Sequence, residues 1–150
     1  MVITDIYKQN RINKGLQEHM LRVASVAKMI CDSFAKPVDT ETIVSACLLH
    51  DMGNLIKTKF ETAPKLFEPE GVEYWINQQK QMKEIYGDDV HNATQAIVKD
   101  VGASQAVQDI IAEASFEEIK GVAEQGSLGA KLLEYADMRV GLHGIISLQE

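Results

Sequence analysis

The chain has 150 residues, a formal charge of −7 and 45% apolar residues. A chain of this length and composition can bury a core, so we expect one folded domain over residues 1–150 rather than general disorder. The negative charge argues against the basic surface that binding to a nucleic-acid polymer requires. The first residues do not resemble a signal peptide and no apolar run is long enough to cross a membrane, so we expect a cytoplasmic protein.

The spacing of the apolar residues, at three and four positions rather than two, predicts an all-α bundle of about six or seven helices. Expected helices cover residues 4–9, 16–34, 40–52, 70–86 and 89–101, followed by one after Ser104, a short one from Ser115 and a last one over 128–140. The stripe Leu16, Met20, Val23, Ala27, Ile30 and Phe34 should face the core.

Several side chains have the chemistry of helix caps. Asp39 or Thr40, Asp88 and Ser104 are expected N-caps, and Ser115 with Glu118 has capping-box spacing. Gly53 is a natural helix stop.

Other parts of the chain carry weaker patterns. Residues 57–70 hold three lysines and two prolines, and we expect an exposed connection or a lid there. Ile145, Ile146 and Leu148 near the C-terminal end need a surface to cover. The two cysteines, Cys31 and Cys47, should be buried and reduced, although their number would also permit a disulfide.

A histidine and an aspartate stand side by side at the end of an apolar run, as His50 and Asp51. Both are good ligands for a divalent metal, and consecutive helical residues can reach one ion only near a helix end. His19 and Asp137 lie beside apolar residues of other helices and can complete a set of two imidazoles and two carboxylates. Such a set balances one divalent ion and favours manganese, iron, cobalt, nickel or zinc over calcium.

Each of these residues also has a purely structural interpretation. A single histidine on a helix flank is usually hydrogen-bonded, and Asp137 can pair with Lys131 or Arg139 at the surface. The ordered combination of His, His-Asp and Asp on helical segments favours the metal site.

This order resembles the HD-domain superfamily of metal-dependent phosphohydrolases. The resemblance is carried by Gln17-Glu18-His19-Met20-Leu21-Arg22-Val23-Ala24, by Ala46-Cys47-Leu48-Leu49-His50-Asp51-Met52-Gly53 and by Tyr135-Ala136-Asp137-Met138-Arg139, and it spans roughly residues 10–140. It implies an all-α fold, with His19, His50, Asp51 and Asp137 as the ligands of one divalent ion. It also implies hydrolysis of a small phosphate ester, often a nucleotide, by a metal-activated water, and members of the superfamily often form homodimers.

Residues near these segments are candidates for catalysis and substrate binding. In several branches the region three residues after the His-Asp pair supplies a charged catalytic residue, but here it is Asn54. Lys57, one turn further, can contact a phosphate or be a solvated surface lysine. Arg11, Lys14 and Arg22 flank His19 and are phosphate-contact candidates of the same kind.

His91 remains open between two interpretations. It resembles a position where some branches place an additional histidine for a second ion, and it can donate a proton, contact phosphate or act as an outer ligand. A capping or surface role is equally compatible with its place in the first turn of a helix. The uncharged Asn54 also leaves room for an alternative function, a catalytically weak or inactive regulatory module that binds metal or nucleotide.

Overall fold

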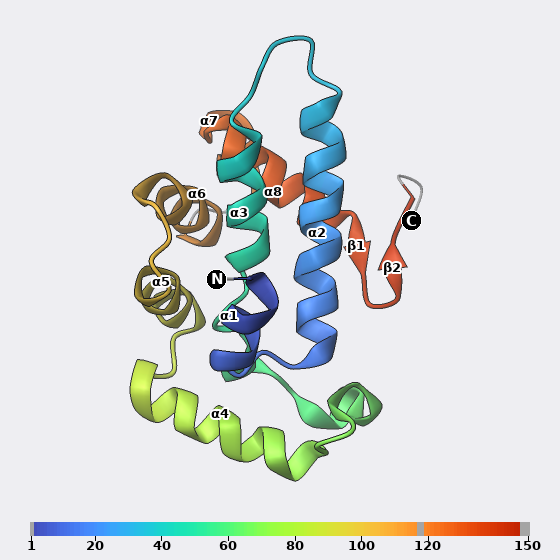
Figure 1. Cartoon of the computed structure of the whole chain (residues 1–150), viewed down its shortest axis with the longest axis vertical. Coiled ribbons are helices and arrows are strands. Elements are labelled where there is room, and N and C mark those ends of the chain that lie inside the picture. The colour runs from blue at the N-terminus through green and yellow to red at the C-terminus, as the bar shows by residue number, and fades with distance from the viewer. Residues whose placement is uncertain (1, 117–118, 148–150) are drawn as a thin grey trace.

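The computed structural model describes residues 2–116 and 119–147, and eight α-helices make up most of the regular structure in these ranges. The helices are α1 (Ile3–Gln9), α2 (Lys14–Asp32), α3 (Thr40–Leu49), α4 (Val72–Tyr86), α5 (Val90–Asp100), α6 (Gln105–Phe116), α7 (Ile119–Gln125) and α8 (Leu128–Met138). A small antiparallel hairpin of β1 (Val140–Gly141) and β2 (Gly144–Ile145) follows α8 (Figure 1). The all-α prediction is confirmed. The described ranges hold eight α-helices, close to the expected six or seven, and α1 and α7 are the two shortest, with seven residues each.

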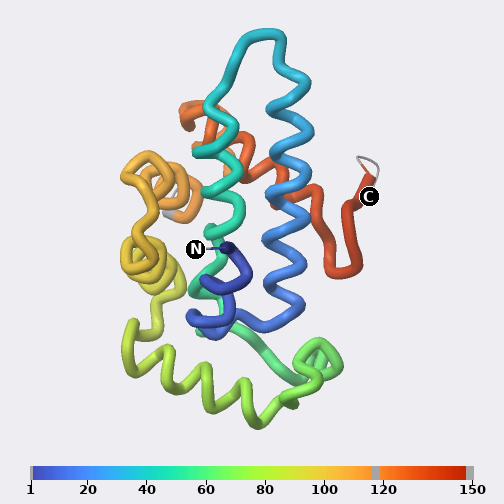
Figure 2. Tube along the Cα trace, viewed as in Figure 1, coloured from blue at the N-terminus to red at the C-terminus, as the bar shows by residue number. Residues whose placement is uncertain are grey.

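Helices α2 and α3 pack side by side in the middle of the molecule, with α5 and α6 on one side of them and the hairpin on the other (Figures 1 and 2). Met20, Val23 and Ala27 of α2 are fully buried, as their spacing predicts. The predicted core position of Phe34 is wrong, because α2 ends at Asp32 and the Phe34 side chain is 41% exposed beyond that end.

Side-chain caps define where the helices begin. Asn13 is the N-cap of α2, where its side chain accepts a hydrogen bond from the Leu16 amide. The helix therefore begins at Lys14, two residues before the predicted start at Leu16. Asp39 caps α3 as expected. The expected cap Asp88 is corrected to Asp89, whose carboxylate accepts from the Asn92 amide at 2.8 Å. Asp89 has extended backbone angles, which place its side chain over the first turn of α5.

The connection between α3 and α4 is more ordered than the sequence suggests. It contains three 3-10 helices, η1 (Asn54–Lys57), η2 (Phe60–Thr62) and η3 (Pro64–Phe67). Phe60 and Phe67 are each 5% exposed and meet edge to face with their ring centroids 4.9 Å apart. The expected exposure is thus confirmed for most of residues 57–70, while two buried aromatic side chains anchor the connection to the core.

The C-terminal hairpin is held to α8 by a pair of reciprocal hydrogen bonds. Arg139 donates from Nε to the Ile146 carbonyl at 2.9 Å, and the Ile146 amide donates to the Arg139 carbonyl at 2.8 Å. Ile145 stays 55% exposed, so the structure gives it no covering surface. Leu148 and the expected capping-box residue Glu118 lie outside the described residues. Ser115, the expected start of a short helix, lies within α6 instead.

Two further observations bear on the sequence predictions. Cys31 and Cys47 are both buried and free, as expected for reduced thiols. Among the described residues, no helix combines the length and apolar character that crossing a membrane would require.

Candidate metal centre

The His-Asp pair lies at the end of α3, where the helix gives way to a turn. The helix ends at Leu49, three residues before the predicted Met52, so His50 is its C-cap and Asp51 lies in the turn beyond. The Nδ1 atom of His50 lies 2.8 Å from the Cys47 carbonyl oxygen and donates to it in the neutral ring. This hydrogen bond turns the other ring nitrogen, Nε2, toward the carboxylates and leaves it as the acceptor.

Gly53 sets the position of the chain directly after this pair. Its amide donates to Thr94 Oγ1 at 3.0 Å, and a Cβ at residue 53 would lie 2.7 Å from both Thr94 Oγ1 and the Val90 carbonyl. Its φ of −92° is ordinary, so the glycine is needed for close packing against α5 rather than for a left-handed helix stop. This close approach brings Asp51 and Asn54 beside the start of α5.

Three helices bring the four predicted ligands to one place. One ligand atom from each of His19, His50, Asp51 and Asp137 lies within 4.8 Å of all the others. The Nε2 atom of His19 is 2.9 Å from Asp137 Oδ1 and 3.5 Å from Asp51 Oδ2. The Nε2 atom of His50 is 3.4 Å from each of the same two carboxylate oxygens. We call these four residues the ligand cluster.

The ligand cluster has the spacing and chemistry that suit a divalent ion. Ligand atoms about 2.1 Å from one ion, at right angles or tetrahedral angles, are separated by about 3.0–3.4 Å. The nitrogen-to-oxygen distances of 2.9–3.5 Å match that separation. The Nε2 atom of His50 is also buried, and its nearest polar neighbours are the carboxylate oxygens of Asp51 and Asp137 at 3.4 Å, which suits an ion between them.

The proximity of these groups changes their protonation. Burial opposes the charged form of His50, but the carboxylates of Asp51 and Asp137 outweigh it and raise its pKa to about 9. Burial likewise opposes ionisation of Asp137, but hydrogen bonding and positive charge from His19 and His50 hold the pKa of Asp137 well below its usual range. A proton on His50 therefore balances the carboxylates when no metal does so.

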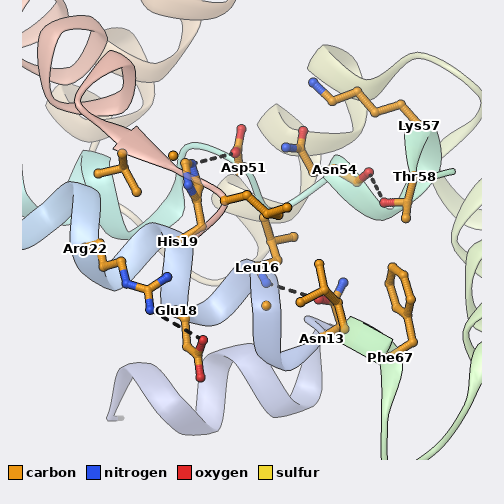
Figure 3. A pocket seen from close by; sticks show the side chains of 15 residues that line it. Asn13, Leu16, Glu18, His19, Arg22, Asp51, Asn54, Lys57, Thr58 and Phe67 are labelled. Carbon is orange, nitrogen blue, oxygen red and sulfur yellow. Dashed lines mark hydrogen bonds and ion pairs between the residues drawn. The ribbon is translucent and has the colours of Figure 1, made fainter. Parts of the chain in front are cut away.

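Two cavities meet at the ligand cluster. The larger, of about 520 Å³, is lined by His19 and Asp51 and is shown in Figure 3. The smaller, of about 160 Å³, is lined by His50, Asp51 and Asp137. The cluster can therefore be reached from either cavity, as a site that binds a substrate and a water could be.

The other predicted site residues divide into two groups. Arg22 lines the larger cavity, His91 lines the smaller one, and Asn54 and Lys57 line both. Arg11 and Lys14 line neither of these cavities. Arg11 donates from Nε to Gln78 Oε1 at 2.9 Å, and the ammonium of Lys14 lies 3.9 Å from Glu18.

Sequence reasoning missed three residues at the site. Glu134 lines the smaller cavity, and burial together with the charge of Asp137 raises its pKa. It precedes Asp137 by three residues, so helical spacing could have revealed it. Thr94, which holds Gly53, and Leu142, which lines the larger cavity from the hairpin, gave no such signal because their positions depend on contacts between distant segments.

The fold and the ligand cluster together define a class: an all-α protein in which helix-borne histidines and carboxylates form a centre that could hold a divalent metal. The family model described as HD domain matches residues 16–139. This chain therefore belongs to the HD-domain family, whose members are generally metal-dependent phosphohydrolases. The comparisons with curated proteins and with solved structures gave no match.

Proposed function

We propose that this protein is a hydrolase of a small phosphate ester, with a nucleotide as the best candidate substrate, and that its activity depends on one divalent transition metal. The observation that carries the proposal is the ligand cluster, with its 2.9–3.5 Å spacing between nitrogen and carboxylate oxygen atoms. Membership of the HD-domain family supports the reaction class.

In the proposed centre, His19, His50, Asp51 and Asp137 hold the ion. When bound, the ion lowers the pKa of a water and neutralises charge that develops on the phosphoryl oxygens. The Cys47 carbonyl holds His50 in the tautomer that presents Nε2, and the two carboxylates come from the turn after α3 and from α8.

The cations around the cavities fit the role of phosphate contacts. Lys57 extends between the two cavities, and its flexible ammonium can approach a phosphoryl group from the side of either one. Arg22 lies further along the larger cavity, where Glu18 is 3.8 Å from its guanidinium (Figure 3). Asn54 can donate a hydrogen bond to a phosphoryl oxygen, and His91 can contact the phosphoryl group from the smaller cavity.

The test compares metal content and turnover in the parent protein and two matched variants. Asp51→Asn removes the charge of one ligand at nearly constant volume, whereas Asp88→Asn makes the same change at a side chain that is 89% exposed. We expect about one equivalent of transition metal in the parent and in Asp88→Asn, and loss of the metal in Asp51→Asn. Turnover of nucleoside phosphates should fall in Asp51→Asn by about a thousandfold or more.

The outcomes separate the proposed enzyme from the regulatory module. Metal-dependent release of phosphate or nucleoside, abolished only in Asp51→Asn, supports the enzyme. Metal bound by the parent, with nucleotide binding but no product after incubation with manganese, cobalt, nickel, iron or zinc, would instead favour the module. Absence of metal from every protein, even after such incubation, would contradict both.

A further inference from the structure

The two cavities at the ligand cluster differ in size and in their walls. The larger measures about 520 Å³, within the range of about 300–1,000 Å³ typical of pockets for drug-sized ligands. The smaller measures about 160 Å³, below that range. Only one side of the cluster therefore has room for a large organic group.

The wall of the larger cavity suits such a group. Phe67 and Leu66 of η3, Leu16 of α2 and Leu142 at the turn of the hairpin give it an apolar surface (Figure 3 shows Leu16 and Phe67). Phe67 is 5% exposed and braced by the edge-to-face contact with Phe60, so its ring is a rigid part of this wall. A flat ring system can bury its faces there.

The wall of the smaller cavity is of a different kind. His91, Thr94, Ser115 and Glu134 give it hydrogen-bonding groups, and Glu134 would repel a second phosphoryl group placed there. This space suits a single phosphoryl group with water, and it does not suit the second organic substituent of an open-chain diester.

The residues between the cavities place the phosphorus atom. Among the described residues, Asp51, Asn54 and Lys57 line both cavities, so they form the boundary between them. Asp51 belongs to the ligand cluster, and Lys57 is the cation of this boundary. A monoester presents three non-bridging oxygens to Asn54, Lys57 and a bound ion, whereas a diester presents only two, so a monoester can use these contacts more fully.

We propose that the substrate is a phosphomonoester of a ring-bearing alcohol of nucleoside size, with the ring in the larger cavity against Phe67 and Leu142 and the phosphoryl group at Asp51, Asn54 and Lys57. This inference rests on the proposed function and selects one substrate class within it. In the reaction, a water oxygen bonds to phosphorus, the ester P–O bond breaks, and the alcohol leaves with a proton, giving inorganic phosphate. Leu142 is then a specificity-determining residue.

The first experiment compares four probes with the metal-loaded protein: a nucleoside 5′-monophosphate, the 5′-diphosphate, the 3′,5′-cyclic diester and a dinucleoside monophosphate. We expect kcat/KM for the 5′-monophosphate to exceed that for each of the others at least tenfold. Equal or faster hydrolysis of any of the other three would overturn the inference and leave the proposed function standing. Failure to hydrolyse any probe, with tight metal binding, would overturn the proposed function.

A second measurement tests the inference without turnover. Binding of a non-hydrolysable nucleoside 5′-phosphonate is measured by calorimetry for the parent, Leu142→Ala and Ile145→Ala. Leu142 and Ile145 are exposed by 64% and 55% in the same hairpin, but only Leu142 lines the larger cavity. We expect Kd to rise threefold or more in Leu142→Ala and to stay unchanged in Ile145→Ala. Equal Kd values for all three proteins would overturn the placement of the ring.

Discussion

The ligand cluster and the wall of the larger cavity are adjacent, yet they are built from different kinds of structure. The cluster residues come from the face or the end of α2, α3 and α8, whose apolar sides are buried in the core. Much of the wall comes from the short 3-10 helices η1 and η3 and from a hairpin with two-residue strands. Short 3-10 helices have weaker hydrogen bonding than α-helices, so they depend on side-chain anchors.

This difference separates two kinds of expected effect. Changes in the ligand cluster should alter metal binding and turnover, because the helices hold its side chains at fixed separations. Changes in the wall should alter the affinity for substrate, because its apolar side chains offer no ligand atoms to a metal.

The largest effect on stability is expected where the two regions join, at Gly53. In Gly53→Ala the new methyl group would lie 2.7 Å from Thr94 Oγ1 and from the Val90 backbone carbonyl, so α5 or the His-Asp turn must shift. We expect a loss of about 1–3 kcal/mol of stability, measured by urea unfolding, together with weaker metal binding and a higher KM.

Gly15→Ala is the matched control for that substitution. Its Cβ would be 3.4 Å from the nearest atom, Asn13 Oδ1, and alanine has a higher helix propensity than glycine in the first turn of α2. We expect Gly15→Ala to leave the free energy of unfolding unchanged or slightly raised. Equal losses of stability in both variants would show that Gly53 has no special contact with α5.

Metal affinity should depend on pH through His50. A metal must displace the proton from His50, whose pKa is raised to about 9 in the metal-free protein. We therefore expect the affinity to rise about tenfold per pH unit as the pH approaches 9 and to level off above it. Titration with cobalt or zinc at a series of pH values measures this slope, and a flat profile between pH 6.5 and 9 would contradict it.

The stability of the metal-free protein should show the opposite trend over the same range. The raised pKa of His50 gives stability that is fully present below the unfolded value of about 6.5 and is lost as the pH rises through about 9. The pKa of Asp137 is lower in the folded protein than its unfolded value of about 3.9. Its ionised form therefore contributes stability above about pH 3.9, and this contribution is lost as the pH falls through the folded-state pKa. Added metal should thus stabilise the protein most at the alkaline end.

The smallest effect is expected at Gln79, which anchors η1 from α4. Its Nε2 lies within hydrogen-bonding distance of the carbonyls of Leu55, Ile56 and Thr58, at 2.7, 3.2 and 3.0 Å. In Gln79→Met these carbonyls lose their donor, and we expect a loss of about 1–2 kcal/mol of stability and a KM several-fold higher with kcat little changed.

Gln108→Met provides the comparison for Gln79→Met. Gln108 donates to a single carbonyl, that of Ala103, and does not line either cavity at the cluster. It should leave KM unchanged. If Gln79→Met lowered kcat and metal content while KM stayed constant, the separation between cluster and wall would be wrong.

The sequence alone determined the class of fold and the members of the ligand cluster. Three- and four-residue spacing of apolar side chains is a local property, so the main helices and the buried face of α2 could be predicted from it. The histidines and aspartates stand beside those apolar positions, and their order along the chain led to the HD-domain resemblance that the family match confirms.

The arrangement of these parts into a site with two cavities depends on contacts between distant segments. Gly53 is required by contact with Thr94, forty-one positions later, and Gln79 reaches η1 from another helix. Leu142 enters the larger cavity because the hairpin folds back beside α2. Such contacts join segments distant in sequence, and residue spacing within one segment carries no information about them.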